Sequence, residues 1–414
     1  MNRLSTSWGD FALTRFPEDP REPLRAWDAA DEYLLRRLAE TEAEAETGTP
    51  DGRAGSRTES GAGPLSGTAG AVVVVGDRWG ALTTALAAHP LVGADRISQI
   101  SDSFLGRQAT LANLARNTPP GSGAAADVRL LSPRDTPPER IDVLLVRVPK
   151  SLALLEDQLH RLAPAVHADT VVIGTGMVSE IHTSTLRLFE RIIGPTRTSL
   201  AVRKARLILS TPDRSLTPGP SPWPLRYDLP ADIGALAGRT VTNHAGIFCA
   251  DRLDIGTRLF LRSLPERAGP VQVVDLGCGN GVVGTAVALA DPGASVTFID
   301  ESYSAVASAE ATYRANVTGG APARFLVGDG MDPVPDASVD LVLNNPPFHS
   351  HRATTDTTAR RMFSGARRAL RPGGELWVIG NRHLGYHVRL RRLFGNAEVV
   401  ASDPKFVVLR AVRR

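Results

Sequence analysis

Short apolar runs alternate with helically periodic segments along most of this 414-residue chain. The first such run, at 71–75, reads Ala-Val-Val-Val-Val, and a continuous β-branched run is typical of a strand buried on both faces. Further strands are expected at 96–100, 128–131, 141–146 and 170–174, with helices between them at 81–88, 104–117 and 152–163. This alternation predicts an α/β fold built on a parallel, doubly wound sheet.

Polar and proline-rich stretches divide the chain into segments. Apolar residues at helical spacing, among them Trp27 and Leu34, predict a helix from Pro23 to Glu46 within an N-terminal segment 1–46. Residues 47–70 are rich in Gly, Thr, Ser and Pro without periodicity, which indicates a flexible, low-complexity insertion. A second proline-rich stretch breaks the pattern after residue 210, so we expect a first domain at 71–210, a linker at 211–240 and a second domain at 241–414.

A glycine-rich turn follows the first strand of the second domain. Glycines at such a strand–helix junction let the chain turn tightly and let a ligand approach the backbone N–H groups. The acidic residue that opens the turn argues against a pyrophosphate and for a cationic or zwitterionic ligand, a description that the ammonium and sulfonium groups of S-adenosylmethionine fit. The candidate cofactor-binding residues of this turn are Asp275, Gly277, Cys278, Gly279, Asn280 and Gly281.

Acidic residues also end the next two expected strands. Asp300 is placed to accept hydrogen bonds from both hydroxyls of a ribose, with Glu301 as the competing candidate and helix capping as the alternative role. In the same interpretation Asp329 accepts a hydrogen bond from an adenine amino group. Gly330 and Asn345 complete the set of expected cofactor-binding residues.

A rigid loop with the sequence Asn-Pro-Pro-Phe follows the strand at 339–344. The side-chain oxygen of Asn345 and the carbonyl of Pro346 can accept both N–H bonds of an exocyclic amine, which frees the nitrogen lone pair to attack a methyl carbon. The prolines fix φ, so the acceptors are positioned in advance, and an aromatic ring stacked on a base contributes about 1–3 kcal/mol. The expected catalytic residues are Asn345, Pro346, Pro347 and Phe348. The amine proton can leave to water or to His349. The favoured role for that histidine is contact with a phosphate or with the base that carries the amine.

The two halves of the chain resemble each other. Residues 97–104 align with 296–303, and both patterns end in Asn, at Asn117 and Asn316, an offset of 199 without gaps. At this offset the first half has Gly-Asp-Arg-Trp-Gly at 76–80 where the second has Asp-Leu-Gly-Cys-Gly, and Arg147 stands one step from the position of Asn345. We therefore expect a duplicated fold whose first copy has lost both loops and does not bind the cofactor.

Composition and charge add less to this picture. The 47 Lys and Arg against 44 Asp and Glu give a net charge of +3, but the arginines concentrate toward the C-terminus, which fits a basic face for a polyanion or the compositional bias of a GC-rich genome. The two cysteines are expected to be free thiols, and no metal site is indicated. Because no apolar run approaches the roughly 20 residues of a membrane span, and no signal peptide precedes the fold, a cytoplasmic protein is expected.

Several segments together resemble the bacterial ribosomal RNA guanine-N2 methyltransferases, and the branch acting on the large-subunit RNA in particular. They are the glycine turn, Asp300-Glu301-Ser302, Asn345-Pro346-Pro347-Phe348-His349, Gly380-Asn381-Arg382-His383-Leu384 and Lys405-Phe406-Val407-Val408-Leu409. The likeness covers nearly the whole chain, except that 47–70 is unusual and Val202-Arg203-Lys204 replaces an expected Trp-Lys-Lys.

This resemblance implies two tandem Rossmann-like methyltransferase domains, the first degenerate and the second active with S-adenosylmethionine. Its implied partner is ribosomal RNA, and the implied product is guanine methylated at N2, in the 23S more than in the 16S RNA. A segment carrying Phe248 and Thr257 is expected to fold over the cofactor. Expected RNA contacts are His349, Arg382, His383, Arg391 and Arg392.

Two other functions remain open at this point. The same loop serves amino methylation of adenine N6 or of a protein glutamine, and nothing in its four residues distinguishes guanine from adenine. A non-catalytic RNA-binding or assembly factor is the alternative from another class, and no obligate protein partner is indicated.

Overall fold

The structure, a computed structural model, describes residues 2–47, 65, 70–90, 92–118, 127–266, 269–320, 322–347 and 352–414. The chain forms two compact units, Met1–Pro222 and Trp223–Arg414. Within the described residues, no helix has the length and apolar character needed to cross a membrane. Most of the expected insertion 47–70 lies outside the described residues.

The first unit begins with a hairpin of β1 (Asn2–Thr6) and β2 (Gly9–Leu13), which leads to α1 (Ala29–Thr47). Its described strands form a seven-stranded sheet of order β5-β4-β3-β6-β7-β9-β8. These strands are β3 (Val72–Val75), β4 (Ile97–Ile100), β5 (Arg129–Leu131), β6 (Ile141–Arg147), β7 (Val166–Met177), β8 (Thr196–Thr198) and β9 (Ala205–Ser210). The helical segments between them are α2 (Ala81–Ala87), η1 (Ala94–Arg96), α3 (Phe104–Asn117), α5 (Leu152–Leu162), η2 (Ala163–Ala165) and α6 (Thr183–Ile192).

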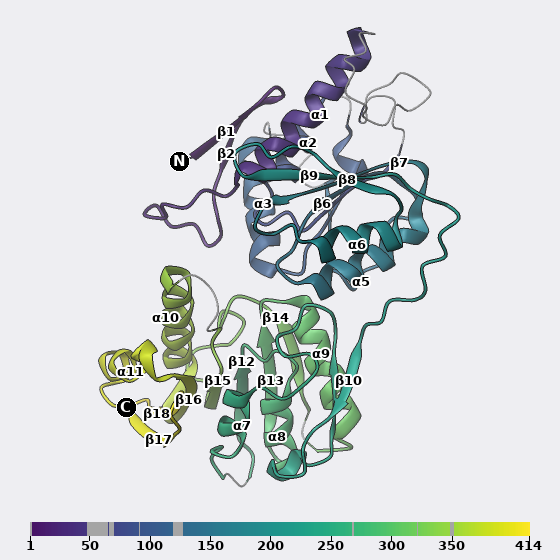
Figure 1. The fold of residues 1–414 in the computed structure, drawn as a ribbon. Helices are drawn as coiled ribbons and strands as arrows, with labels where there is room; N and C mark the ends of the chain where they lie inside the picture. Colours follow the sequence, from purple (N-terminus) through teal and green to yellow (C-terminus); the bar gives the residue numbers. More distant parts are fainter. Residues whose placement is uncertain are drawn as a thin grey trace. The chain divides into compact units, whose positions relative to one another are not determined.

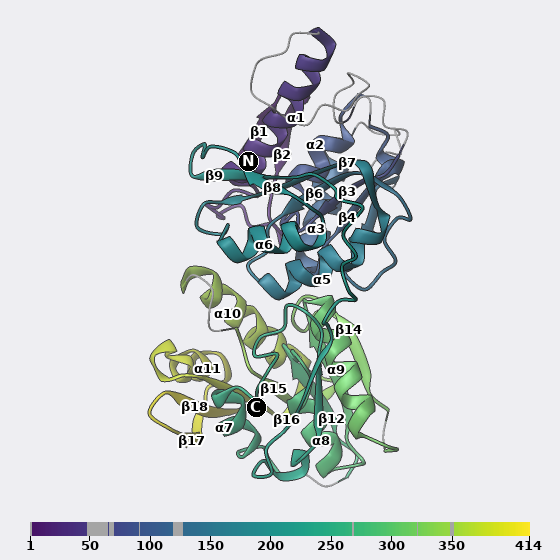
Figure 2. The same ribbon diagram turned by 45° about the vertical axis from the view of Figure 1, so that its right-hand side comes forward.

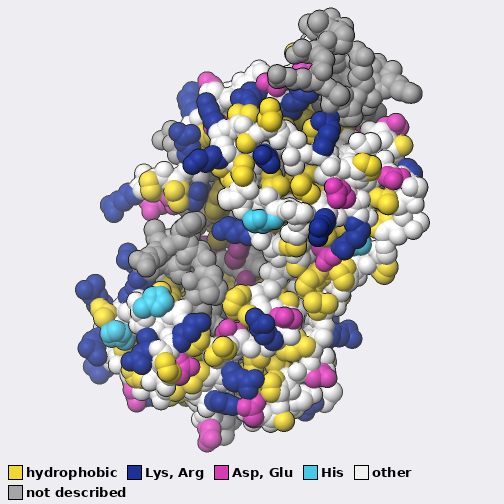
Figure 3. Space-filling model, viewed as in Figure 1, with side chains coloured by type: hydrophobic (Ala, Val, Ile, Leu, Met, Phe, Trp, Pro, Cys, Tyr) yellow, Lys and Arg dark blue, Asp and Glu magenta, His cyan; other side chains and the backbone are white. Residues whose placement is uncertain are grey.

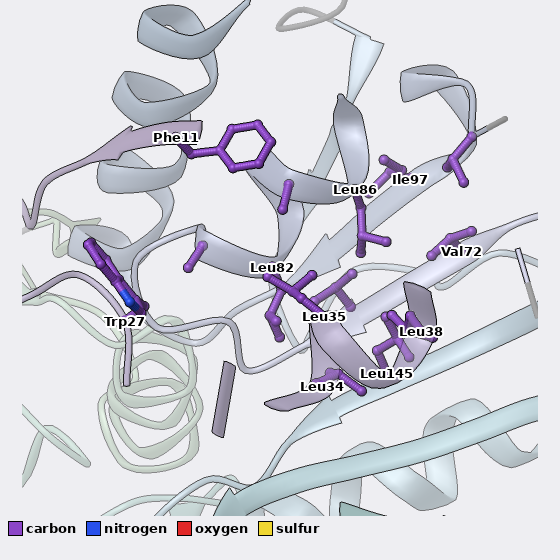
Figure 4. Close-up of a cluster of buried hydrophobic side chains, with 14 of the residues drawn as sticks. Phe11, Trp27, Leu34, Leu35, Leu38, Val72, Leu82, Leu86, Ile97 and Leu145 are labelled. Atoms are coloured by element: carbon purple, nitrogen blue, oxygen red, sulfur yellow. The ribbon is translucent and has the colours of Figure 1, made fainter. Parts of the chain in front are cut away.

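Helices cover both faces of this sheet, as Figures 1 and 2 show. The four valines of β3 are buried because alternate side chains enter opposite layers: Val72 and Val74 pack with α1, α2 and α3, and Val73 and Val75 with α5 and α6. Figure 4 shows part of the first layer, in which the leucines of α1 and α2 meet the sheet. The continuous valine run therefore indicated the two-sided burial correctly.

The second unit has the same plan (Figure 1). It opens with β10 (Leu225–Asp228), η3 (Gly234–Leu236), β11 (Thr240–Asn243) and α7 (Ile255–Leu261). Its described sheet has the order β14-β13-β12-β15-β16-β18-β17. Its strands are β12 (Gln272–Leu276), β13 (Ser295–Asp300), β14 (Arg324–Val327), β15 (Val339–Asn344), β16 (Leu370–Asn381), β17 (Glu398–Ser402) and β18 (Phe406–Val412). Its remaining helical segments are α8 (Val282–Ala290), α9 (Tyr303–Asn316), α10 (Arg352–Ala369), η4 (Arg382–Leu384) and α11 (Tyr386–Phe394). One layer contains α7, α8 and α9, and the other contains α10 and α11.

The expected parallel sheet is wrong for one strand of each unit, β9 in the first and β18 in the second. Strands β5, β4, β3, β6 and β7 run parallel, but β9 is antiparallel to both β7 and β8. Strand β18 pairs in the same way with β16 and β17. A hairpin brings the chain back beside the strand it has just formed, and such a local return leaves no helical crossover in the sequence pattern.

Each unit also starts with a hairpin that the sequence interpretation missed. Residues 1–46 contain β1 and β2 as well as α1, which begins at Ala29 rather than Pro23, and the expected linker 211–240 contains β10 and η3 of the second unit. Short strands that alternate apolar and polar residues give a weak signal, and Pro-rich neighbours obscured it. The amide of Asn117 donates to the carbonyl of Ala12, and that of Asn316 donates to the carbonyl of Thr240. The equivalent asparagines of the two copies thus hold equivalent hairpins.

Strand pairing corrects the register of the duplication. Val72 pairs with Ile97, whereas Val273 pairs with Val296, so Val72 is equivalent to Val273 and not to Val271. The chain between these strands is two residues shorter in the second unit, which is why a gap-free offset failed there. The segment 76–80 is therefore equivalent to the glycine turn 277–281 itself.

The last glycine of the turn is present in both units for a structural reason. Gly80 and Gly281 have φ values of 80° and 76°, and a Cβ on either would lie 2.6 or 2.7 Å from the Cα of Thr110 or Ala309 in the following helix. Close packing between the two helices requires glycine there whether or not a ligand binds. The first unit has kept the turn, contrary to the expectation that it was lost, and differs at Arg78, which replaces Gly279.

The position of Asn345 is occupied in the first unit by Arg147. Val146 pairs with Val75 just as Asn344 pairs with Leu276, so the next residues, Arg147 and Asn345, are equivalent. The Arg147 side chain is fully buried in an ion-pair cluster. Its Nη2 lies 2.6 Å from Asp28, its Nε lies 3.4 Å from Asp31, and its Nη1 lies 2.8 Å from Glu180.

Arg78 completes this cluster. Its guanidinium lies 3.3 Å from Asp28 and 2.5 Å from Glu180. Two cations and three carboxylates thus fill the carboxyl edge of the first sheet, where open α/β sheets bind their ligands. The arrangement explains physically why this copy is expected not to hold a cofactor.

Replacing Arg147 with Ala is expected to destabilise the first unit strongly. Three carboxylates would lose a buried counter-charge, which costs about 3–5 kcal/mol in comparable buried ion pairs. The exposed pair between Arg191 and Glu156 provides the control, since Arg191→Ala is expected to cost less than about 1 kcal/mol. Urea unfolding, combined with hydrogen exchange of peptides from 1–222, measures both, and equal losses for the two variants would contradict the assigned role of the cluster.

The cluster also predicts an acid-dependent stability term carried by Glu180. Burial opposes ionisation of Glu180, but the Arg147 charge and hydrogen bonds from Arg78, Met177 and Arg147 prevail and lower its pKa from 4.5 to about 2. A carboxyl with a depressed folded-state pKa stabilises the fold above its unfolded pKa and loses that effect as the pH falls toward its folded pKa. The difference in unfolding free energy between wild type and Glu180→Gln should be constant from pH 7 to 5.5 and shrink from pH 4.5 downward. A difference independent of pH down to 3 would refute this.

Candidate functional site

The candidate site lies at the carboxyl edge of the second sheet, where β12 runs into the glycine turn. The N–H groups of Gly277 and Cys278 donate to the carbonyl of Ile299, at 2.8 and 3.0 Å, and that of Gly281 donates to the carbonyl of Cys278 at 2.8 Å. These bonds fold the turn against the end of β13 before α8 begins. Burial raises the pKa of the Cys278 thiol well above its usual value, so the turn offers a neutral thiol and no thiolate.

Asp275 has a clear structural role beside its expected ligand contact. Its Oδ2 accepts from the N–H of Gly284 at 2.8 Å in the first turn of α8. Burial raises its pKa to about 7, the Gly284 hydrogen bond works against that shift, and the charge of Asp300 adds to it. In the first unit Asp77 accepts at 2.8 Å from the N–H of Thr83, the equivalent of Gly284. The same helix terminus is thus capped in both copies by carboxylates from different positions.

Asp300 holds the glycine turn in place. Its Oδ2 accepts from the N–H of Gly279 and its Oδ1 from the N–H of Ser302, each at 3.0 Å, while burial raises its pKa. The competing candidate, Glu301, is exposed. Gly279 has a φ of 54°, and no described atom lies within 4 Å of the place where a Cβ would stand. Unlike Gly281, Gly279 borders open space in the described structure, and this is the position at which the first unit has arginine.

The other cofactor candidates lie at the same edge or face neighbouring elements. Asn280 donates from Nδ2 to Oδ1 of Asn243 at the end of β11, 3.0 Å away. Asp329, after β14, forms an ion pair with Arg361 of α10, and Gly330 has a φ of 55°. Sequence reasoning did not identify Arg361 as a neighbour of Asp329, because the packing of α10 across the sheet is not encoded in local spacing.

Asn345 carries a buried side-chain oxygen without a described partner, as do its neighbour Asn344 and Asn381 at the end of β16. The Asn345 Nδ2 donates to Oγ1 of Thr257 at 3.2 Å, and its Oδ1 is buried without a hydrogen-bond partner among the described residues. Leaving a buried acceptor unsatisfied costs about 1–3 kcal/mol, so such atoms are rare and call for an explanation. A ligand that supplied an N–H would recover this energy.

The loop around Asn345 is tied to the glycine turn. Asn344 donates from Nδ2 to the carbonyl of Leu276 at 2.7 Å, which joins β15 to β12 where both strands end. The Asn345 carbonyl oxygen lies 3.7 Å from the position of a Cβ on Gly277, so the two loops adjoin. Pro346 is buried and Pro347 exposed, while Phe348 and His349 lie outside the described residues.

The expected RNA contacts fall in two places. Arg382 and His383 are exposed in η4, directly after β16, and so share the sheet edge with Asn345, because Val378 of β16 pairs with Asn344. Arg391 and Arg392 are exposed in the last turn of α11. Figure 3 shows Lys and Arg side chains gathered along the left-hand side of the second unit, where Figure 1 places α11.

The chain after β11 contributes one exposed residue, Phe248, and one buried residue, Thr257 in the first turn of α7. Thr257 is only 7% exposed and contacts Asn345, whereas Phe248 is 58% exposed. The sequence placed both near the site but gave no sign of the Thr257–Asn345 hydrogen bond. Thr257 and Asn345 are 88 positions apart in the sequence, and no rule of local spacing relates residues so far apart.

Comparison with known proteins identifies both units. The methyltransferase small domain family matches residues 238–410, and the RLMG N-terminal domain family matches residues 1–55 and 57–214. The chain is 67% identical to ribosomal RNA large subunit methyltransferase G of Streptomyces griseus subsp. griseus over 100% of both chains. It is 44% identical to the protein of the same name from Stutzerimonas stutzeri over 99% of both.

A solved structure shares the fold across the whole chain. It is the T. thermophilus 16S rRNA N2 G1207 methyltransferase (RsmC) in complex with AdoMet and guanosine, with a TM-score of 0.69 at 20% identity, covering 100% of this chain and 98% of that one. The likeness confirms the expected pair of tandem Rossmann-like methyltransferase domains. Because the chain is 67% and 44% identical to these two relatives over 99–100% of their length, it belongs to the ribosomal RNA large subunit methyltransferase G family.

Proposed function

We propose that the second unit transfers a methyl group from S-adenosylmethionine to the exocyclic N2 of a guanine in ribosomal RNA, the 23S RNA of the large subunit rather than the 16S. The observation that carries this proposal is the buried, unsatisfied Oδ1 of Asn345 at the carboxyl edge of the sheet, beside the glycine turn. Family membership supports the ribosomal RNA substrate, which would place the enzyme in the cytoplasm.

The residues at the sheet edge fit the cofactor. Open space over Gly279 gives a flat ligand access to the turn, and the Asp300 carboxylate, which accepts from backbone N–H groups, has further lone pairs for ribose hydroxyls. Asp329 would accept from the adenine amino group next to Arg361, and Asp275 would attract the ammonium group. Bound S-adenosylmethionine supplies an electrophilic methyl group on a sulfonium.

This chain's own residues orient the amine. The Oδ1 of Asn345 and the carbonyl of Pro346 would accept the two N–H bonds of the guanine amino group, which draws the nitrogen lone pair out of conjugation. Proline rings fix the backbone, so little reorganisation is needed when the base arrives. Phe348 would stack on the base, and the proton would leave to water or to His349 after transfer.

RNA recognition would use the edge residues around the loop. A guanine within folded RNA must leave its stack to reach Asn345, and Arg382 and His383 are placed to contact the phosphates beside it. Arg391 and Arg392 would extend the basic surface along α11. The first unit, whose equivalent edge is filled by the Arg147 cluster, would hold RNA without cofactor.

Replacing Asn345 with Ala is expected to lower turnover by about 100-fold or more while leaving cofactor affinity within about threefold of wild type. Loss of one preorganised group that acts on the reacting atoms typically costs about 10²–10³ in rate. Single-turnover transfer of labelled methyl to large-subunit RNA measures the first quantity, and calorimetry with S-adenosylmethionine measures the second. Near-normal turnover in this variant would show that the side-chain acceptor is not needed.

Analysis of the labelled nucleoside tests the substrate. Reaction of the protein with naked 23S RNA, 16S RNA, assembled subunits and DNA, followed by hydrolysis to nucleosides, is expected to yield N2-methylguanosine from the 23S RNA. Labelled N6-methyladenosine or methylglutamine would replace the guanine proposal with the corresponding alternative. Cofactor binding without transfer to any RNA would favour a non-catalytic assembly factor.

A further inference from the structure

We propose that Thr257, held by Asp254, is a positioning residue that fixes the rotational orientation of the Asn345 amide. The inference rests on the proposed function and names two residues that touch neither cofactor nor substrate in it. The hydrogen-bond chain runs from the Asp254 carboxylate through the Thr257 hydroxyl to the Asn345 Nδ2, and it ends with the Asn345 Oδ1 buried without a described partner.

An asparagine amide can present either of its ends to a ligand. Rotation by 180° exchanges an oxygen that accepts for a nitrogen that donates, and the two ends have nearly the same shape. Only the oxygen can accept an N–H from a substrate amine, so the inverted amide would place two donors face to face. The site therefore needs a device that distinguishes the ends.

A threonine hydroxyl by itself does not provide that distinction, because it can both donate and accept. The Asp254 carboxylate removes the ambiguity. Its Oδ2 accepts from the Thr257 Oγ1 at 3.4 Å and from the Thr257 N–H at 3.0 Å. With its hydrogen directed to Asp254, the hydroxyl offers only lone pairs to Asn345, and the Nδ2 end turns toward it at 3.2 Å.

The support for this chain of contacts is rigid. Asp254 is the N-cap of α7, so its side chain is fixed by the start of the helix. Gly256 lets this terminus pack closely on β18, since a Cβ there would lie 3.1 Å from the ring of Phe406. Thr257 is 7% exposed, and its β-branched side chain has few rotamers available.

The first unit provides independent support. Its helix α1 also follows an aspartate, Asp28, which accepts from the N–H of Ala30, and it packs on β7 and β9 as α7 packs on β16 and β18. The residue three positions after Asp28 is Asp31, and its carboxylate faces Arg147 at 3.4 Å. Asp31 and Arg147 thus occupy the positions of Thr257 and Asn345. Where one member of the pair is an arginine, the other is a carboxylate, so the two positions interact directly in both copies.

The test compares Thr257→Val, which removes the hydroxyl and keeps the shape, with Thr257→Ser, which keeps the hydroxyl. In the full-length protein, Thr257→Val is expected to lower kcat about tenfold, with KM for RNA and cofactor affinity unchanged, while Thr257→Ser stays within about threefold of wild type. Asp254→Asn, which retains a capping side chain but can also donate, should lower kcat to a similar extent as Thr257→Val. Thr240→Val, at a half-buried threonine of β11 whose hydroxyl donates to Asp228 and not to the site, is the matched control and should leave kcat unchanged.

Non-additivity separates positioning from a general structural role. If Thr257 acts only through the Asn345 amide, Thr257→Val should cause no further loss of kcat in an Asn345→Ala background. A multiplicative loss, a wild-type kcat for Thr257→Val, or equal losses for Val and Ser together with lower thermal stability would each overturn the inference. Absence of methyl transfer by the wild-type protein would instead overturn the proposed function, and the two failures are thus distinguishable.

Discussion

The hydrogen-bonded register between β12 and β15 is the constraint on which the site depends. Parallel pairing of Leu276 with Asn344 ends both strands at one level, and the Asn344 amide locks that level by donating to the Leu276 carbonyl. The glycine turn follows β12 directly and the Asn345 loop follows β15 directly, so the two loops lie next to each other. A slip of one residue would turn every side chain of β15 to the opposite face and remove Asn345 from the edge.

The two units show how the same backbone edge supports opposite electrostatic arrangements. In the second unit the edge has small residues, carboxylates that accept from backbone N–H groups, and buried asparagine oxygens without a described partner, that of Asn345 among them. In the first, Arg78 and Arg147 enter the same positions and are neutralised by Asp28, Asp31 and Glu180. The glycine needed for helix packing, Gly80 or Gly281, is present in both copies, whereas Gly279, which borders open space, is replaced by Arg78 in the first unit. Packing requirements and ligand requirements can therefore be separated within a single chain.

Much of this could be inferred from the sequence, because strong local patterns carry it. The valine run of β3, the helix at 104–117 and the glycine turn each follow from propensity and spacing, and the duplication followed from internal similarity. The antiparallel strands and the initial hairpins were missed because their signals are short. The register error of two residues arose because a gap-free comparison cannot detect a shortened loop.

The candidate site was harder to predict than the fold. The roles of Asn345 and the glycine turn could be inferred because their residue types stand at a fixed spacing in the sequence. The side chains that contact the site residues, Thr257, Arg361 and Asn243, come from distant parts of the chain. The sequence also did not show that the Asp275 carboxylate is buried and accepts from the first turn of α8, because this depends on how α8 packs.

The most direct measurement is a high-resolution structure of the full chain with S-adenosylhomocysteine and guanosine. The account predicts that the guanosine N2 lies about 2.7–3.2 Å from the Asn345 Oδ1, with the Asn345 Nδ2 still on Thr257 and the ligands confined to the second unit. Guanosine bound with its amino group away from Asn345, or cofactor at the Arg147 edge of the first unit, would contradict it.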